Sequence, residues 1–289
     1  MLRSFELVEP TSLPEASACL EHYGEEAKLY AGGSELLLVM RLGLLRPKVL
    51  INIKPIPGLD RLELESGQLM LGSLVTHRKL EISALVSEKF PLIARMESKV
   101  ANVRVRNVGT LGGNLAFAEP HSDPATLFLV YEAEVVIQSH QRQRRIPLSD
   151  FFLGPYETVM EPTEILREIR IPPMPQGMRG AYIKWGVLER PTLNVAVGAR
   201  LAEGKWLEAV RAAVGCVGPK PLRLVQLEES LRGLELSAAD QYIAKSQEVL
   251  KKLLKPVSDI YGSGDYKAYM VKTLLRRALR QAVEGNSHG

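Results

Sequence analysis

Two pairs of adjacent glycines constrain most strongly how this chain can fold. The first pair lies in Ala31-Gly32-Gly33-Ser34, and the second lies in Gly109-Thr110-Leu111-Gly112-Gly113-Asn114. Glycine permits positive φ and close approach of the backbone, so consecutive amide N–H groups can turn inward and bind a phosphate. Either pair alone also fits an ordinary tight turn between a strand and a helix. Two turns of the same chemistry favour two loops that grip one diphosphate.

Two further observations bear on the ligand of these turns. The hydroxyls of Ser34 and Thr110 add hydrogen-bond donors beside the glycine pairs. The chain contains neither G-x-G-x-x-G nor G-x-x-x-x-G-K-[ST], the signatures of Rossmann and Walker-type nucleotide binding. Both of these binding modes are therefore excluded.

The chain of 289 residues has only two cysteines, Cys19 and Cys216. Two thiols are too few for a disulfide framework, a cysteine-rich zinc site or an iron–sulfur cluster, so any iron–sulfur chemistry must come from another chain. Cys19 lies on the apolar face of an expected helix, which favours a core residue over a reactive thiol. The formal charge of +4, from 37 Lys and Arg against 33 Asp and Glu, does not predict a nucleic-acid partner.

No segment has the pattern of a membrane span or a secretory signal. The longest apolar run, residues 36–40, ends at Arg41 and is far shorter than the ~20 residues that cross a bilayer. Glu6 interrupts the N-terminal apolar stretch before a signal sequence can form. We therefore expect a cytoplasmic protein. The basic stretch 140–145 lacks interleaved aromatic residues and indicates a solvated hairpin or a subunit contact.

Two proline-rich breaks, at residues 54–58 and 172–177, divide the chain into three parts. Apolar alternation predicts strands at 27–30, 49–53, 62–71 (as a hairpin), 133–138, 165–171, 181–186, 195–202 and 209–217. Caps and helical spacing predict helices at 12–23, 35–42, 76–85, 90–103, 237–255 and 266–283. Residues 108–124 are expected to form a long loop. The fold class that follows is α+β.

The motifs occur in an order that resembles a known family. The densest match is residues 105–114, followed by Pro120 and Asp123. Further matches are Phe5, residues 10–13, 31–37, 40–41, 46–47, 50–53 and 75–77, and, near the end, Tyr266 and residues 275–279. In this order and spacing the chain resembles the FAD-binding medium subunit of the molybdenum hydroxylases, the family of xanthine dehydrogenase and aerobic carbon monoxide dehydrogenase.

The resemblance implies an α+β fold with a FAD-binding domain of the vanillyl-alcohol-oxidase (PCMH) type. Its two subdomains are expected at residues 1–57 and 58–174, with FAD held between them. A C-terminal α+β domain of the carbon monoxide dehydrogenase flavoprotein type, a three-stranded sheet with helices, is expected at residues 175–289. The flavin is expected to bind noncovalently, because neither glycine turn carries a histidine or cysteine positioned for attachment.

The resemblance also implies which residues bind FAD, and it implies no catalytic or metal-binding residue in this chain. The first pyrophosphate loop is expected at Leu29, Tyr30, Ala31, Gly32, Gly33, Ser34, Glu35 and Leu36. The second loop, which in the family also approaches the flavin, is expected at Thr110, Leu111, Gly112, Gly113 and Asn114. The remaining expected positions are Thr76, Ala101, Gly109, Asp123, Leu166 and Lys184.

Asp123 and Lys184 have the clearest chemical roles under this resemblance. The carboxylate of Asp123 suits the sugar or ribityl hydroxyls of the flavin, because a carboxylate accepts from paired hydroxyls. The alternative is an aspartate that caps the loop before Pro124. Leu166 and Lys184 match positions that flank the flavin ring, where a cation near the pyrimidine edge stabilises the reduced anion. A solvated lysine on a strand explains Lys184 almost as well.

The chain departs from the family pattern at several positions. Ser34 and Glu35 replace the usual threonine and aspartate, which keeps the hydroxyl and the charge. The other departures are Arg104 for a common glutamine, Glu119 and His121 for small residues, and Glu189-Arg190 with Asn194 where the family tends to have arginine followed by aspartate. The outer face of the flavin is therefore expected to be tuned differently.

Three other groups of residues are weaker candidates. His77 follows Thr76 and could be a base, although a capping or surface histidine is the simpler interpretation. His121 and Asp123 lie two residues apart, but no third or fourth ligand accompanies them, so the sequence does not predict a metal site. A helix surface or an interface is indicated for Arg276, Arg277 and Arg280.

The resemblance implies an oxidoreductase subunit that transfers electrons within a heterotrimer, with a dimer of heterotrimers expected. In such enzymes a large molybdopterin subunit hydroxylates the substrate. A small subunit with two [2Fe-2S] clusters carries the electrons, and FAD in the medium subunit passes them to an external acceptor. Two alternatives stand beside this hypothesis. One is a stand-alone flavin oxidoreductase of the same fold that acts on its own organic substrate, and the other is a flavin-free assembly protein.

Overall fold

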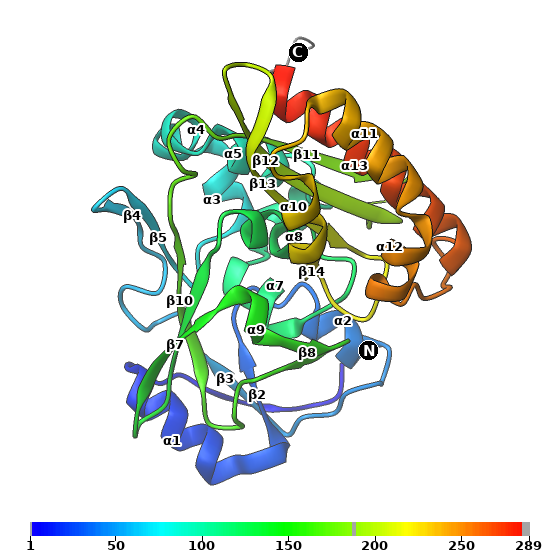
Figure 1. Cartoon of the computed structure of the whole chain (residues 1–289). Helices are drawn as coiled ribbons and strands as arrows, with labels where there is room; N and C mark the ends of the chain where they lie inside the picture. The colour runs from blue at the N-terminus through cyan, green and yellow to red at the C-terminus, as the bar shows by residue number, and fades with distance from the viewer. Residues whose placement is uncertain (1, 187–188, 285–289) are drawn as a thin grey trace.

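The N-terminal part of the chain builds a small parallel sheet. The computed structural model describes residues 2–186 and 189–284 (Figure 1). Three strands pair in the order β1-β3-β2, and the middle strand is buried along its whole length. Parallel strands need a crossover, which a helix supplies here. The elements are β1 (Glu6–Val8), α1 (Leu13–Tyr23), the 3-10 turn η1 (Gly24–Glu26), β2 (Ala27–Tyr30), α2 (Leu36–Arg41) and β3 (Val49–Asn52).

The middle part is an antiparallel sheet in the strand order β4-β5-β10-β6-β7. The predicted hairpin forms the β4–β5 pair at the edge of this sheet. The basic stretch 140–145 falls on the second hairpin, β6–β7, which is one of its two expected structures. The strands are β4 (Leu62–Glu65), β5 (Gln68–Gly72), β6 (Glu134–Gln138), β7 (Gln143–Pro147) and β10 (Ile165–Ile171), with a separate pair β8 (Phe152–Gly154) and β9 (Glu157–Thr158).

Seven helices pack on the middle sheet or beside it. They are short, and side-chain caps determine where several of them begin. Thr76, Ser83, Asn102 and Thr110 each cap the helix that follows. The helices are α3 (His77–Ile82), α4 (Ala84–Lys89), α5 (Pro91–Glu97), α6 (Val103–Val108), α7 (Leu111–Phe117), α8 (Asp123–Val130) and α9 (Leu148–Phe151).

The C-terminal part is an antiparallel sheet with helices against it. The three predicted strands are present, and a fourth strand of two residues, β14, extends the sheet. Figure 1 shows α11 and α13 lying along the outer side of this sheet. The elements are β11 (Arg179–Trp185), β12 (Leu193–Ala202), β13 (Trp206–Gly215), β14 (Leu222–Arg223), α10 (Val225–Leu231), α11 (Leu236–Lys245), α12 (Gln247–Leu254) and α13 (Gly264–Glu284).

Strand β12 is buried on both faces because helices cover both sides of the sheet. Seven consecutive residues, 193–199, are buried. One face packs against α13 and the other against α8. Accordingly, Val195 and Val197 belong to the C-terminal hydrophobic core, whereas Ala196 belongs to the core of the middle part. Helix α8 therefore joins the two parts through apolar contacts.

The α+β fold class is confirmed, but some expected helices are divided. The helix expected at 76–85 ends at Ile82, because Ser83 starts α4 by accepting from the Val86 amide. The helix expected at 90–103 ends at Glu97. Ala101, with φ +39°, interrupts the helical path before α6.

Two other expectations differ from the structure. The long loop expected at 108–124 contains all of α7, and α8 begins within its last residues. The helix expected at 237–255 is divided at Ser246 into α11 and α12, and Glu235 precedes α11 as its N-cap residue. Ser237 is therefore inside the helix and not its cap.

None of the described helices is long and apolar enough to cross a bilayer.

We predict that Phe128→Ala strongly destabilises the protein. Phe128 is fully buried on α8, the helix shared by the middle core and the C-terminal sheet. Loss of a buried phenyl group leaves a cavity, so the free energy of unfolding should fall by about 3–5 kcal/mol. Urea denaturation would measure this change. Leu153→Ala, at a strand position that is 53% exposed, is the control and should change it by less than about 0.5 kcal/mol. Equal effects of the two substitutions would contradict this account of α8.

Candidate functional site

The first glycine turn joins β2 to α2, and the amides of Gly33 and Ser34 are free in it. Gly33 has φ +79°, a conformation that favours glycine. Within residues 2–186 and 189–284, no acceptor takes the amide N–H of Gly33 or Ser34. Successive free amides in a half-buried turn form a concave anion-binding site. The first turn can therefore bind one side of a diphosphate.

The second glycine turn uses its amides inside the protein. It forms the N-terminus of α7, where the Thr110 side chain caps the helix. The amide of Leu111 donates to the Val75 carbonyl, and the amide of Gly112 donates to the Ser73 carbonyl, each at 2.9 Å. Contrary to the sequence interpretation, these two amides are not available to a phosphate.

The two glycine turns contact each other. A Cβ atom added to Gly32 would lie 2.0 Å from the carbonyl oxygen of Val108, and one added to Gly109 would lie 3.3 Å from the Ser34 hydroxyl. A side chain at position 32 would thus separate the turns, because a real Cβ never lies so close to a backbone atom. The two sequence motifs therefore form one structural unit.

Thr76, another predicted position, lies beside the second turn. Thr76 and Thr110 form an isolated antiparallel bridge. The amide of the next residue, His77, donates to the Gly109 carbonyl at 3.1 Å. The structure therefore brings the predicted positions of the first turn, Thr76 and the second turn to one place.

The two glycines of the second pair have different surroundings. A Cβ atom added to Gly112 would lie 2.4 Å from the Cβ of Ser73, so this glycine permits close packing. A Cβ atom added to Gly113 would meet only the Thr110 hydroxyl, at 2.9 Å, and otherwise faces open space. Gly113 is thus the glycine of this pair that leaves room for a ligand.

Asp123 and Lys184 form a buried ion pair. Lys184 Nζ donates to Asp123 Oδ2 at 2.8 Å, and the Tyr182 hydroxyl donates to Oδ1. Burial raises the pKa of the Asp123 carboxyl, and the ammonium of Lys184 opposes that rise. The side chain of Lys184 is only 13% exposed. The alternative of a solvated strand lysine is therefore excluded.

Two further hydrogen bonds connect this ion pair to segments that hold predicted positions. Lys184 Nζ also donates to the carbonyl oxygen of Lys99 at 2.7 Å, two residues before Ala101. The Asn114 side chain accepts from the Ser122 hydroxyl at 2.6 Å, directly before Asp123. The ion pair is thus connected to α7 and to the segment between α5 and α6.

The remaining predicted positions contribute mainly packing. Leu166 is buried on β10, and Leu29 packs against the N-terminal core. The ring of Tyr30 lies against Gly33, where an added Cβ atom would be 2.5 Å from Tyr30 Cε2. Leu36 is half-buried as the first residue of α2.

A buried histidine–glutamate pair lies behind the second turn, and sequence reasoning missed it. His77 Nδ1 lies 2.7 Å from Glu97 Oε2, and both side chains are buried. A Cβ atom added to Gly109 would lie 3.3 Å from His77 Cδ2. His77 is therefore neither a surface nor a capping residue. No signal in the sequence links residues 77 and 97, because only the packing of α3 on α5 brings them together.

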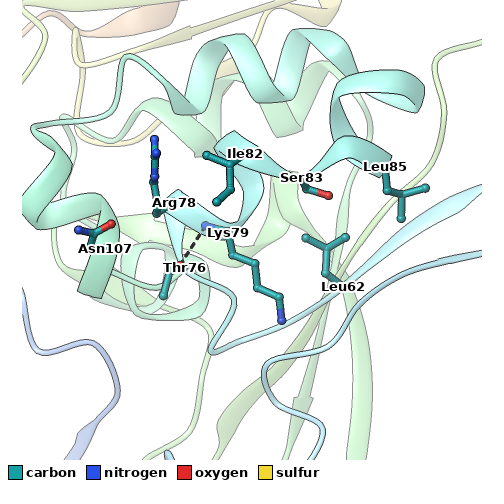
Figure 2. A pocket seen from close by; sticks show the side chains of 8 residues that line it. All are labelled: Leu62, Thr76, Arg78, Lys79, Ile82, Ser83, Leu85 and Asn107. Carbon is teal, nitrogen blue, oxygen red and sulfur yellow. Dashed lines mark hydrogen bonds between the residues drawn. The ribbon is translucent and has the colours of Figure 1, made fainter.

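An open hollow of about 630 Å³ lies beside α3 and shares Thr76 with the predicted site. Figure 2 shows Thr76 and Asn107 at one end of it and the apolar side chains of Leu62 and Leu85 at the other. The Lys79 amide donates to the Thr76 hydroxyl across the start of α3. The glycine pairs themselves do not line this hollow.

The weaker sequence candidates have structural partners. His121 bonds to Glu119 and Asp259 and not to Asp123. In the described part of the chain, no group of three or more His, Cys, Asp or Glu side chains could hold a metal ion. Arg276 and Arg280 form ion pairs with Asp240 of α11, a contact within the chain.

Comparison with known proteins identifies the family. The family described as the FAD binding domain in molybdopterin dehydrogenase matches residues 3–174, and the carbon monoxide dehydrogenase flavoprotein C-terminal domain matches residues 189–282. The chain belongs to the FAD-binding subunits of the molybdenum hydroxylase family. The family, the oxidoreductase class and the FAD-binding domain predicted from the sequence are thereby confirmed.

Individual relatives agree with this family along nearly the whole chain. The carbon monoxide dehydrogenase medium chain of Hydrogenophaga pseudoflava is 33% identical over 280 residues, which cover 96% of each chain. The nicotine 6-hydroxylase medium subunit of Paenarthrobacter nicotinovorans is 33% identical and covers 97% of this chain and 98% of its own. In the solved carbon monoxide dehydrogenase of H. pseudoflava, the matching chain has a TM-score of 0.92 at 32% identity, with 98% of both chains covered.

We predict that Gly113→Val removes FAD from this flavoprotein subunit but leaves it folded. The valine would project into the open space beside the second turn and would disturb only the Thr110 cap, at a cost of about 1 kcal/mol. The FAD-to-protein absorbance ratio and the melting temperature would report the two effects separately. Ala18→Val, at an exposed position of α1, should keep its FAD. A Gly113→Val protein with a full complement of FAD would show that the diphosphate lies elsewhere.

We also predict that Glu97→Gln becomes relatively more stable as the pH rises. Burial raises the pKa of Glu97 above its ordinary value of 4.5, although His77 opposes the rise. A carboxyl whose pKa is higher in the folded state than in the unfolded state stabilises the fold. This contribution to the free energy of unfolding is fully present below the unfolded-state pKa and is lost as the pH rises through the folded-state pKa. The glutamine carries no charge and avoids this loss.

Melting curves at about pH 5 and about pH 8 would test the role of Glu97. The difference in melting temperature between Glu97→Gln and the native chain should move in favour of the variant at the higher pH. Glu229→Gln, at an exposed position of α10, should show no such change. The same pH dependence in both variants would count against a special role of the buried carboxyl.

Proposed function

We propose that this chain is the electron-transfer subunit of a heterotrimeric molybdenum hydroxylase. It would receive electrons from the iron–sulfur clusters of a small partner subunit and pass them, through FAD, to an external acceptor. The observation that carries the proposal is the contact between the two glycine turns, with free amides at Gly33 and Ser34 and open space beside Gly113. This arrangement fits the diphosphate of FAD.

The residues present fit FAD as the bound group. The free amides of the first turn would bind the diphosphate, and Gly113 would allow its close approach. The carboxylate of Asp123, held by Lys184, would accept from flavin hydroxyls. When bound, FAD supplies the ability to accept electrons singly and to release them singly or as a hydride equivalent. The roles assigned to these residues follow from the resemblance, and the packing described above supports them.

The cysteine content supports a division of labour among subunits. A [2Fe-2S] cluster requires four protein ligands, usually thiolates, and this chain has two cysteines in 289 residues. Cys216, directly after β13, is also buried. The two clusters and the molybdopterin are therefore assigned to partner chains. The relatives described above are named as a medium chain and a medium subunit, which fits this assignment.

The domain boundaries and the assembly also belong to this proposal. We assign the two FAD-binding subdomains to residues 1–57 and 58–174 and the C-terminal domain to residues 175–289, with FAD bound noncovalently. The assembly would be a dimer of heterotrimers in the cytoplasm.

Co-purification from the source organism tests the proposal. A tagged chain should bring down two further chains, one with iron and acid-labile sulfide and one with molybdenum. Reduction of the clusters in this complex should bleach the FAD absorbance. The isolated chain should bind FAD but turn over no organic substrate. Purified chain that oxidises an alcohol without partners would favour the stand-alone oxidoreductase instead, and a well-folded chain that binds no FAD would favour the assembly protein.

A further inference from the structure

Acidic and basic side chains alternate along a continuous path beside the first glycine turn. We call this set, Glu35, Arg190, Glu119, His121, Asp259 and Lys267, the ionic chain. It starts at the residue that follows Ser34 in the first turn and ends on α13. Three segments distant in sequence lie between these ends: the residues before β12, the loop between α7 and α8, and the residues before α13.

The first link of the ionic chain holds the first glycine turn. Arg190 Nη2 donates to both carboxylate oxygens of Glu35, at 2.8 and 2.9 Å. Arg190 Nη1 lies 3.0 Å from Glu119. Glu35 also leads directly into α2. A guanidinium that binds two carboxylates at once fixes their relative position better than an ammonium can.

The second half of the ionic chain centres on His121. Its Nδ1 lies 2.9 Å from Glu119 and its Nε2 lies 3.0 Å from Asp259. Carboxylate oxygens are hydrogen-bond acceptors, so each of these two contacts suits a donor on the ring of His121. The ring also packs against Tyr261, with 4.6 Å between ring centroids and 47° between the ring planes. Lys267, fully buried on α13, completes the path by bonding to Asp259.

The middle of the ionic chain is shielded from solvent. The side chains of Glu119 and His121 are 11% and 12% exposed. Burial alone would raise the pKa of the Glu119 carboxyl, but the bond with His121 and the charge of Arg190 hold it below its usual value. Shielded, hydrogen-bonded charges in series support one another more strongly than isolated surface pairs.

We propose that Arg190 is a positioning residue for FAD, and that the ionic chain holds the first glycine turn closed over the diphosphate. Arg190 acts through Glu35 and need not contact the cofactor. The carbonyl of Val108 supports the turn at Gly32, and Arg190 fixes its other end at Glu35. Release of FAD then requires the turn to move away from both contacts, so the strength of the ionic chain limits the rate of FAD dissociation. This inference rests on the proposed placement of the diphosphate at the two turns.

The test is the rate of FAD release from the full-length chain, measured by the rise of flavin fluorescence after dilution. Arg190→Gln should release FAD about tenfold faster, because it removes a two-oxygen charged contact. Arg190→Lys should release FAD at a rate between those of the native chain and Arg190→Gln. Lysine keeps the positive charge but lacks the planar guanidinium that binds both carboxylate oxygens. His121→Gln should give a smaller increase in the same direction. Should Arg190→Gln fail to fold, Glu35→Gln breaks the same link from the other side.

Arg200→Gln is the matched control. Arg200 also makes a two-oxygen contact with Glu208, at 2.9 and 3.1 Å, and its exposure is similar to that of Arg190. It lies on β12 of the C-terminal sheet. The Arg200→Gln variant should release FAD at the same rate as the native chain. The melting temperatures of the FAD-free variants should match, which separates positioning of FAD from a general loss of stability.

A double-mutant cycle measures the coupling directly. The double variant, Glu35→Gln with Arg190→Gln, should release FAD no faster than either single variant. Each substitution breaks the same contact, the one between Arg190 and Glu35. Fully additive effects, or an Arg190→Gln rate equal to that of Arg200→Gln, would overturn the proposal. Native chain that holds no FAD at the two turns would instead count against the placement of the cofactor.

Discussion

The close contact between Gly32 and the carbonyl of Val108 is the interaction on which the rest of the site depends. It places two turns that are far apart in sequence against each other, and it tolerates no side chain. Backbone hydrogen bonds to the carbonyl groups of Ser73 and Val75, which directly follow β5, fix the second turn. The middle sheet therefore supports the second turn directly, and it supports the first turn through the second. Because this support is backbone to backbone, the free amides of the first turn are held in place before any ligand binds.

The C-terminal part also contributes side chains to the site. Strand β11 carries Tyr182 and Lys184, which hold the carboxylate of Asp123 at the start of α8. The same sheet packs on α8 through Ala196 and Ala213. Apolar packing thus sets the distance that the ion pair requires, and the pair orients the carboxylate. The ionic chain through Arg190 adds a second, more exposed connection to the first turn.

The sequence predicted the elements that have a long regular pattern and missed those held by tertiary contacts. Strands β6 and β10 and helices α1 and α13 lie within two residues of their predicted bounds, because apolar periodicity and caps determine them. Helix α7 was expected to be a loop, because Gly112 and Gly113 disfavour a helix. The helix is stabilised by the Thr110 cap and by backbone hydrogen bonds to other segments. For the site, residue types and spacing located both turns. Some of these glycines pack closely and another faces open space, and this depends on Val108 and Ser73. No local sequence pattern reveals the positions of these two residues.

The most direct test of this account is a crystal structure of the full-length chain grown with FAD. We expect the diphosphate within hydrogen-bond distance of the amides of Gly33 and Ser34, beside Gly113, with Asp123 bonded to flavin hydroxyls. Density for the diphosphate in the hollow beside α3, with the two glycine turns unliganded, would contradict it.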